Sequence, residues 1–266
     1  MNIIVCTKQV MDPEAPPARF MVDTATNKLI LPTDIPPVID PYSEYALEAA
    51  LKLRDKYAGT ITAISLGNNL LREVIKKPLS MGADELVLLE DELFADGDSW
   101  LTAKILAIAI TKIDAYDIIL CGRQSADRDA GQVGSGIAEI LKLPVITVAR
   151  KIDIAGGKVL VERVTDDGYE TIETTLPTVI TVSNEIGEPR YPTIRGIMAA
   201  KKKEPTIWKS TDLGIEPSEL GVGGFRSHLV KLLKPVYEGK CEIIEGETPE
   251  EAASNLAGRL RQEKLL

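Results

Sequence analysis

Short apolar runs alternate with longer amphipathic stretches from the start of the chain to about residue 150. The apolar runs predict strands at residues 3–6, 60–66, 85–89, 118–121 and 145–148. The amphipathic stretches predict helices at residues 44–57, 70–80, 99–113 and 132–141, the second disturbed in its last turn by Pro78. Strands separated by helices of about 10–15 residues predict a parallel sheet covered on both faces. We therefore predict an α/β fold with a Rossmann-like, doubly wound, mainly parallel sheet.

Two stretches depart from this alternation within the first 182 residues. Residues 13–37 are rich in proline, which predicts a long, partly extended excursion rather than a regular element. Residues 158–164 and 169–175 flank the turn sequence Thr165-Asp-Asp-Gly168, which predicts a β-hairpin. A further strand is expected at residues 179–182.

The last third of the chain is polar and shows little periodicity after residue 184. Near its end, Thr248-Pro-Glu-Glu251 combines an N-cap, a proline at the first helical position and a glutamate three residues after the cap. This pattern predicts a final helix to about residue 260. We interpret the tail as an extended C-terminal arm that lies on a partner subunit.

One loop carries most of the candidate chemistry. It begins at Gly122, after an apolar run, and leads into the amphipathic stretch that starts near Gln132. A strand end, a loop and a helix N-terminus bring together unpaired amides and the positive end of a helix dipole, which suits a phosphate or pyrophosphate. The loop has no Walker lysine motif and no G-x-G-x-x-G motif, because Glu139 occupies the place of the third glycine. The alternative interpretation is an ordinary strand-to-helix loop.

Composition argues against several other classes of function. The net charge of −9 argues against a general role on nucleic acid or on an anionic membrane. No apolar run approaches the roughly 18 residues that a membrane span needs, and we expect no signal peptide because Ile3 already begins a strand pattern. The cysteines lack metal-binding spacing and are typical of a reduced, cytoplasmic protein. His228 is the only histidine, so neither a histidine-based triad nor a histidine-ligated metal is expected.

Several short motifs stand in a definite order along the chain. They are Val5-Cys-Thr-Lys-Gln-Val10, Asp40-Pro-Tyr-Ser43, Ala63-Ile-Ser-Leu-Gly67, Met81-Gly-Ala-Asp84, Gly122-Arg-Gln124 with Gln132-Val-Gly134, Val161-Glu-Arg163 through Glu170, and Glu188-Pro-Arg-Tyr-Pro-Thr-Ile194. In this order, and over almost the whole length, they resemble the beta subunit of electron transfer flavoproteins.

The resemblance implies the adenine nucleotide alpha-hydrolase-like form of the α/β fold. It also implies a heterodimer with an electron transfer flavoprotein alpha subunit, whose FAD exchanges electrons with partner proteins. The beta subunit of this family holds an adenine nucleotide, which is AMP in some members and a second FAD in electron-bifurcating members. The chain is then divided into a nucleotide-binding α/β domain (residues 1–185), a partner recognition loop (186–203) and a C-terminal arm on the alpha subunit (204–266).

The resemblance assigns the cofactor to strand ends and to the loop after residue 121. Backbone amides of residues 122–133 would hold the phosphates, with Arg123 as a charge partner, while Asp127 and Asp129 would cap the helix or bind a ribose hydroxyl. The positions that match the family's cofactor site are Cys6, Asp40, Pro41, Tyr42, Ser43, Leu66, Gly67, Gly122, Arg123, Gln124, Ser125, Ala126, Asp127, Asp129, Ala130, Gly131, Gln132 and Val133.

The resemblance places partner binding in a second segment, which would engage an acyl-CoA dehydrogenase or a similar oxidoreductase. Ile194 is the expected apolar anchor, and the alternative is that it packs inside the protein. The segment comprises Tyr191, Pro192, Thr193, Ile194, Arg195, Gly196, Ile197 and Met198.

Three positions depart from the family pattern. Asp40 stands where asparagine is usual, which would alter hydrogen bonding to ribose or adenine. Arg195-Gly196 replaces a Pro-Asn pair and is more similar to the bifurcating members. Gly224-Phe-Arg-Ser227 replaces Gly-Ser-Pro-Thr, which puts contacts from that segment in doubt.

We expect an electron carrier subunit without catalytic residues or a metal of its own. FAD is favoured over AMP because Arg123 and residues 195–198 fit the FAD-binding members, and NADH is then a transient substrate. One alternative is a non-bifurcating carrier with structural AMP. A different class, a stand-alone regulator of the universal-stress type, leaves the arm and the recognition segment unexplained. An adenylate-forming enzyme would need a Ser-Gly-Gly-x-Asp-Ser loop where this chain has Cys6-Thr-Lys-Gln9.

Overall fold

The structure is a computed structural model, and it describes residues 1–266 except 31, 96, 114, 221–223, 236–238 and 240. The chain forms two compact units. The first comprises Met1–Phe20 and Ile30–Val230, and the second comprises Met21–Leu29 and Lys231–Leu266.

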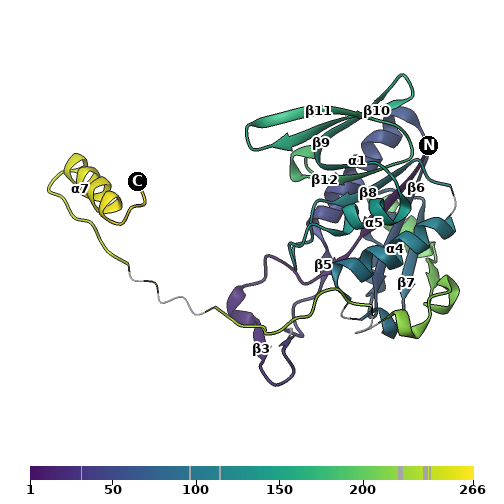
Figure 1. The fold of residues 1–266 in the computed structure, drawn as a ribbon, viewed down its shortest axis with the longest axis horizontal. Coiled ribbons are helices and arrows are strands. Elements are labelled where there is room, and N and C mark those ends of the chain that lie inside the picture. Colours follow the sequence, from purple (N-terminus) through teal and green to yellow (C-terminus); the bar gives the residue numbers. More distant parts are fainter. Residues whose placement is uncertain (31, 96, 114, 221–223, 236–238, 240) are drawn as a thin grey trace. The chain divides into compact units, whose positions relative to one another are not determined.

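The described part of the first unit is built on a nine-stranded sheet. Its strands are β1 (Asn2–Thr7), β6 (Thr60–Gly67), β7 (Glu85–Glu90), β8 (Ile118–Gly122), β9 (Val145–Ala155), β10 (Lys158–Thr165), β11 (Gly168–Thr174), β12 (Thr178–Val182) and β13 (Thr206–Trp208). Their order is β11-β10-β9-β12-β8-β1-β6-β7-β13 (Figure 1). From β9 to β13 in this order each strand runs parallel to its neighbours, whereas β9, β10 and β11 pair antiparallel. The predicted mainly parallel α/β fold is confirmed.

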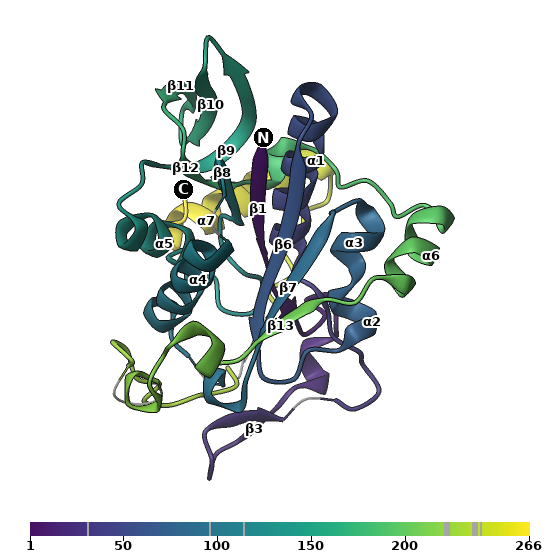
Figure 2. The ribbon, with the colours of Figure 1, turned by 90° about the vertical axis from the view of Figure 1, so that its right-hand side faces the viewer.

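Helices cover both faces of this sheet. They are α1 (Pro41–Tyr57), α2 (Arg72–Ile75), α3 (Lys77–Met81), α4 (Ser99–Ile113) and α5 (Val133–Leu141), and α6 (Ile194–Lys202) lies against α3. Side chains alternate between the faces of a strand, so Ile3 and Val5 pack with α1 in one apolar cluster while Ile4 packs with α4 and α5 in the other. Figure 2 shows α4 and α5 on one side of the strands and α1 and α3 on the opposite side.

The strand order reverses direction beside β1. The chain leaves β1 through α1 and places β6 on one side, whereas β8 lies on the other side of β1. A crevice forms at such a switch because the connections leave the neighbouring strand ends in opposite directions. The carboxyl ends of β1 and β8 are therefore the expected place for a ligand.

The structure corrects the bounds of two predicted elements and the type of a third. The helix expected at residues 70–80 is divided into two short helices: α2 ends at Ile75, and Pro78, which lacks a backbone N–H, lies in the first turn of α3. The disturbance expected from Pro78 is therefore present but interrupts the helix earlier than its last turn. The strand predicted at 145–148 extends to Ala155, where it pairs with β10. Residues 194–202, expected as part of a loop, form α6, which begins after the N-cap Thr193.

The proline-rich excursion also contains regular structure. At its two ends, β2 (Gln9–Val10) pairs antiparallel with β5 (Val38–Ile39). Between them, β3 (Met21–Asp23) and β4 (Lys28–Ile30) form a two-stranded sheet. The expectation of an extended segment without a regular element was therefore too simple.

The first unit continues well past residue 185. The strand β13 pairs with β7, and Ile215 and Leu220 are buried in the cluster that contains α4. The second unit carries α7 (Pro249–Gln262), whose N-cap Thr248 accepts a hydrogen bond from the amide of Glu251, as the sequence predicts. The packing of the arm on an alpha subunit stays a prediction. Within the described ranges, no helix is both long and apolar enough to cross a membrane.

Candidate functional site

The carboxyl ends of β1, β6 and β8 meet at a cavity of about 240 Å³. One wall is the loop from Gly122 to Gln132, and the opposite wall includes the start of α4. The cavity lies at the switch in strand order, where doubly wound sheets bind their ligands. The strand order and the cavity therefore indicate the same site, at the carboxyl ends of β1 and β8.

Two cysteine side chains line this cavity at the strand ends. Val5 and Leu120 are paired across β1 and β8, so Cys6 and Cys121 follow as the next neighbours, and both are buried. A hydrogen bond with Cys121, together with burial, raises the pKa of the Cys6 thiol well above its usual value. A thiol that stays protonated is a poor nucleophile, so Cys6 supplies packing surface rather than covalent chemistry.

The N-terminus of α5 faces the cavity without a cap. Its N-cap residue Gln132 makes no side-chain cap bond, and within the described part of the chain no side chain accepts from the amides of its first turn. The first turn contains no acidic residue, and Gln132 and Val133 line the cavity. Gly131 precedes it with a φ of 63°, which glycine adopts without a steric penalty. Backbone N–H groups and the positive helix end are therefore directed at the site. This donor set fits a phosphate. Of the two roles expected for Asp127 and Asp129, capping α5 was wrong, and binding a ribose hydroxyl stays a prediction.

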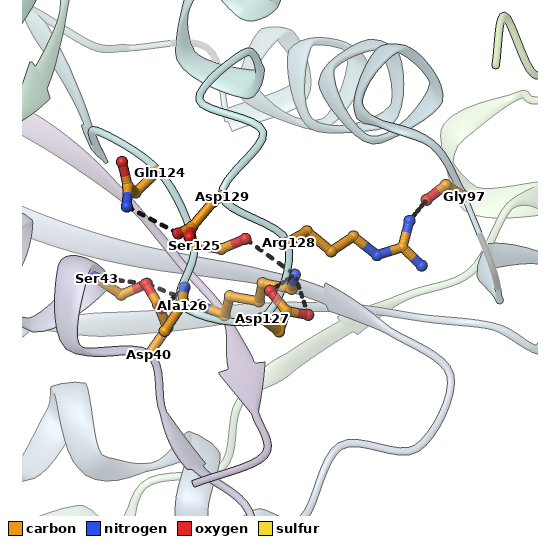
Figure 3. Close-up of polar contacts among 10 residues, drawn as sticks. Asp40, Ser43, Gly97, Gln124, Ser125, Ala126, Asp127, Arg128 and Asp129 are labelled. Carbon is orange, nitrogen blue, oxygen red and sulfur yellow. Dashed lines mark hydrogen bonds and ion pairs between the residues drawn. The ribbon is translucent and has the colours of Figure 1, made fainter. Parts of the chain in front are cut away.

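The loop from Gly122 to Gln132 is fastened to the start of α1 through Asp40. One carboxylate oxygen of Asp40 accepts from the amide and hydroxyl of Ser43 at 2.9 and 3.1 Å, and the other accepts from the amide of Ala126 at 2.8 Å (Figure 3). Burial raises the pKa of Asp40 above its usual value, and the donors from Ala126 and Ser43 oppose that shift. Asp40 lines the cavity, yet both of its oxygens are engaged within the protein. Asp40 therefore positions the loop.

An ion pair joins the same loop to the end of β1. The ammonium of Lys8 lies 2.6 and 2.7 Å from the two carboxylate oxygens of Asp127 and 3.4 Å from the hydroxyl of Ser125. Burial alone would raise the pKa of Asp127, but the contact with Lys8 outweighs it and holds the pKa below the usual value. Asp127 is thus a compensated carboxylate at the cavity wall, which reduces its repulsion of a phosphate.

Most of the cofactor residues predicted from the sequence meet at this one cavity. The lining includes Cys6, Asp40, Ser43, Leu66, Gly122, Arg123, Gln124, Ser125, Asp127, Ala130, Gly131, Gln132 and Val133. Five predicted residues are not part of the lining: Pro41, Tyr42, Gly67, Ala126 and Asp129.

Two of these five residues, Tyr42 and Asp129, contact residues of the lining. A Cβ atom on Gly122 would lie 2.6 Å from Cβ of Tyr42, so glycine allows the end of β8 to approach α1. The Tyr42 ring lies 5.8 Å from the guanidinium of Arg123, and Asp129 accepts a hydrogen bond from Gln124 at 2.8 Å. Their contribution is to the shape of the loop.

Sequence reasoning missed one side of the cavity. The missed lining residues on that side are Phe94, Gly97, Ser99, Thr102 and Leu106. Arg128 also lines the cavity and lies within the loop expected to hold the phosphates, while Thr7, Lys8 and Cys121 lie beside predicted positions without having been named as site residues. The lining residues from 94 to 106 follow β7, a parallel strand whose carboxyl end lies at the same edge as β1 and β8. The predicted strand at 85–89 could therefore have indicated the region after it.

The predicted partner segment presents an exposed apolar surface. The side chains of Tyr191, Ile194 and Met198 are 93%, 83% and 55% exposed, so Ile194 is not an internal packing residue. Thr193 caps α6 by accepting from the amide of Gly196. Before it, Arg190 forms a two-pronged ion pair with Glu48 on α1, at 2.9 and 3.0 Å. These contacts fix α6 to the first unit while leaving its outer face open.

Comparisons with known proteins agree with this architecture. Residues 29–213 match the family model described as an electron transfer flavoprotein domain. The chain is 41% identical to an electron transfer flavoprotein subunit beta of Thermoanaerobacterium thermosaccharolyticum, with 100% of both chains covered. It is 37% identical to the caffeyl-CoA reductase–Etf complex subunit CarD of Acetobacterium woodii, and 35% identical to an electron transfer flavoprotein subunit beta of Clostridium acetobutylicum, again with 100% of both chains covered. The fold, the motifs and these full-length matches together show that the chain belongs to the electron transfer flavoprotein beta subunit family.

Proposed function

We propose that this chain is the beta subunit of a heterodimeric electron transfer flavoprotein and holds an adenine nucleotide in the cavity at the end of β8. The observation that carries the proposal is the uncapped N-terminus of α5, which opens onto a cavity at the switch in strand order. Amide donors there suit phosphate oxygens without any metal or acid–base residue. Arg123 and Arg128 add positive charge at the same cavity.

We propose FAD as the nucleotide, with AMP as the alternative. A bound flavin would supply the electron-accepting and electron-donating chemistry, while the chain supplies position and electrostatics. The cavity of about 240 Å³ is smaller than the roughly 300–1,000 Å³ typical of small-molecule pockets. It therefore suits the AMP half of FAD, and the flavin half would extend beyond it.

We propose two protein partners. The exposed face of α6, with Tyr191, Ile194 and Met198, would dock on an acyl-CoA dehydrogenase or a similar oxidoreductase. The second unit, with α7, would pack on an alpha subunit that carries its own FAD. The free cysteines fit a reducing compartment such as the cytoplasm.

Electron bifurcation is the more specific version of this function. It is supported by the full-length similarity to a subunit of a caffeyl-CoA reductase–Etf complex. Arg123 and the sequence Arg195-Gly-Ile-Met198 favour the same version. NADH would then be the electron donor. A stand-alone regulator of the universal-stress type offers no role for the exposed face of α6 or for α7.

The test is to co-express the chain with its alpha subunit, extract the nucleotides and count them per heterodimer. Two FAD and no AMP support the FAD version, and one FAD with one AMP supports the alternative. A colourless, folded chain that forms no heterodimer and binds ATP would contradict the proposal.

Bifurcation needs a separate measurement, because two flavins alone do not establish it. The assay follows NADH oxidation with a low-potential acceptor and a CoA-ester or quinone acceptor, supplied singly and together. Bifurcation predicts that NADH oxidation requires both acceptors and reduces them in equal electron amounts. Full reduction of either acceptor alone would contradict it.

A further inference from the structure

The guanidinium of Arg128 is held at the cavity by a neutral acceptor. Nη1 of Arg128 donates to the carbonyl oxygen of Gly97 at 3.2 Å, and both residues line the cavity. Figure 3 shows the Arg128 side chain reaching from the loop to Gly97. Among the residues that the structure describes, no carboxylate forms an ion pair with Arg128. Its charge is therefore available to a ligand.

The other charged groups at the cavity are engaged differently. The ammonium of Lys8 is paired with Asp127, and Asp40 accepts from three protein donors. Separating Lys8 from Asp127 would break a pair of opposite charges, and freeing Asp40 would break three hydrogen bonds to its carboxylate. Releasing Arg128 from Gly97 separates no pair of opposite charges, because it breaks one hydrogen bond to a neutral carbonyl. Arg123 likewise has no carboxylate partner among the described residues, but it is held by two contacts: its Nε donates to Oε1 of Gln124 at 3.2 Å, and its guanidinium lies 5.8 Å from the Tyr42 ring. Arg128 is held by one hydrogen bond, so it is the group that can change partner at the lowest cost.

Gly97 lies on a fixed part of the opposite wall. The next residue, Asp98, is buried; one of its oxygens accepts from the amide of Leu101 at the start of α4. Its other oxygen accepts from the amides of Arg226 and Ser227 at 2.7 and 2.9 Å. Arg128 therefore spans the cavity from the loop to an anchored point beside Ser99 and Thr102, which also line the cavity. It stands on the α4 side of the uncapped α5 terminus.

We propose that Arg128 is a specificity-determining residue that selects a nucleotide with a pyrophosphate over one with a single phosphate. This inference rests on the proposed adenine-nucleotide site. The amides at the start of α5 serve one phosphate group, and the guanidinium of Arg128 leaves Gly97 to bind the second. A planar guanidinium fork matches two phosphate oxygens at once, so the gain exceeds the lost carbonyl contact.

The test uses the full-length chain freed of bound nucleotide and titrated by calorimetry with AMP, ADP and FAD. In the variant Arg128→Gln, ADP and FAD should bind at least about tenfold more weakly, because a charge-assisted bond is lost, whereas AMP binding should change less than about twofold. Arg128→Lys should recover part of the loss, since it keeps the charge without the fork. Unchanged AMP binding also shows that the variant is folded.

Arg163→Gln is the matched control, because it removes the same charge from the β10–β11 hairpin, where Arg163 pairs with Glu170. It should leave the affinities for all three nucleotides unchanged. Equal losses for AMP and ADP in Arg128→Gln would overturn the inference, because they would indicate general attraction, and so would unchanged ADP binding. Wild-type protein that binds none of the three would overturn the proposed function together with this inference.

Discussion

Asp40 and Ala126 lie 86 positions apart in the chain, and the carboxylate of Asp40 accepts a hydrogen bond from the amide of Ala126 at 2.8 Å. The same carboxylate caps α1 through Ser43. One side chain therefore holds both the start of α1 and the loop that forms the cavity wall. The shape of the site depends on this buried contact.

The variant Asp40→Asn should loosen the loop although it changes few atoms. Asparagine offers one acceptor oxygen, so its NH₂ group would face the N–H of either Ala126 or Ser43. A buried donor left without an acceptor costs about 1–3 kcal/mol of unfolding free energy. Urea unfolding should show a loss of that size, with weaker nucleotide binding.

Asp166→Asn is the control for that substitution, because Asp166 is exposed in the turn between β10 and β11. It should change the unfolding free energy by less than about 0.5 kcal/mol. Equal stability of Asp40→Asn and Asp166→Asn would show that the contact with Ala126 does not hold the loop.

Acid should weaken the attachment of α1 to β9 through Asp153. Contacts with Lys56, Tyr57 and the amide of Ile154 lower the pKa of Asp153 to about 2, below the usual range of an aspartate. A lowered folded-state pKa stabilises the fold above the unfolded-state pKa, and this stabilisation is lost as the pH falls from about 4 to about 2. Asp153→Asn should flatten the unfolding free energy over that window. The effect should be small, because the Asp153 side chain is partly exposed to solvent. An unchanged pH dependence in Asp153→Asn would contradict this role.

Gly196 should be required for the position of α6. A Cβ atom there would collide with the carbonyl oxygen of Ser80 on α3. Gly196→Ala should therefore shift α6 and cost about 1–3 kcal/mol, as overpacking does. Gly258→Ala in α7 is the control, because its Cβ would meet no atom within 4 Å. If thermal unfolding ranks the two variants equally, α6 is not packed as described.

Ile194 should matter for a partner and not for the fold. Its side chain is 83% exposed, so Ile194→Ala should leave the unfolding free energy almost unchanged. If α6 docks on a dehydrogenase, the variant should raise the KM for that partner about tenfold, as loss of an apolar anchor does. Val145→Ala, which truncates an exposed side chain on β9, should leave the KM unchanged. An unchanged KM in Ile194→Ala would exclude it as the anchor.

The regular α/β half of the chain could be predicted because its pattern is local. The helix at residues 99–113 was predicted with the bounds that α4 has, since its apolar spacing and its flanks all lie within one stretch. The helix α6 was missed because only nine residues form it and most of its apolar side chains face outward. A short helix with an exposed apolar face has no core pattern to reveal it.

The site was predicted as a set of residues but not as a set of contacts. The pairing of Lys8 with Asp127 joins positions 119 apart, and Arg128 with Gly97 joins positions 31 apart. Such contacts follow from the strand order, which one sequence does not specify. Similarly, Val148 adopts a φ of 58° where the register between β9 and β12 shifts. The side-chain pattern of the sequence does not predict a β-bulge of this kind.

The most direct test of the central claim is an experimental structure of the chain with its alpha subunit, purified with the nucleotides it carries. We expect an adenine nucleotide in the cavity between Leu66 and the loop 122–132, with a phosphate at the amides that begin α5. A nucleotide bound elsewhere on this chain, or a complex whose only nucleotide lies in the alpha subunit, would contradict it.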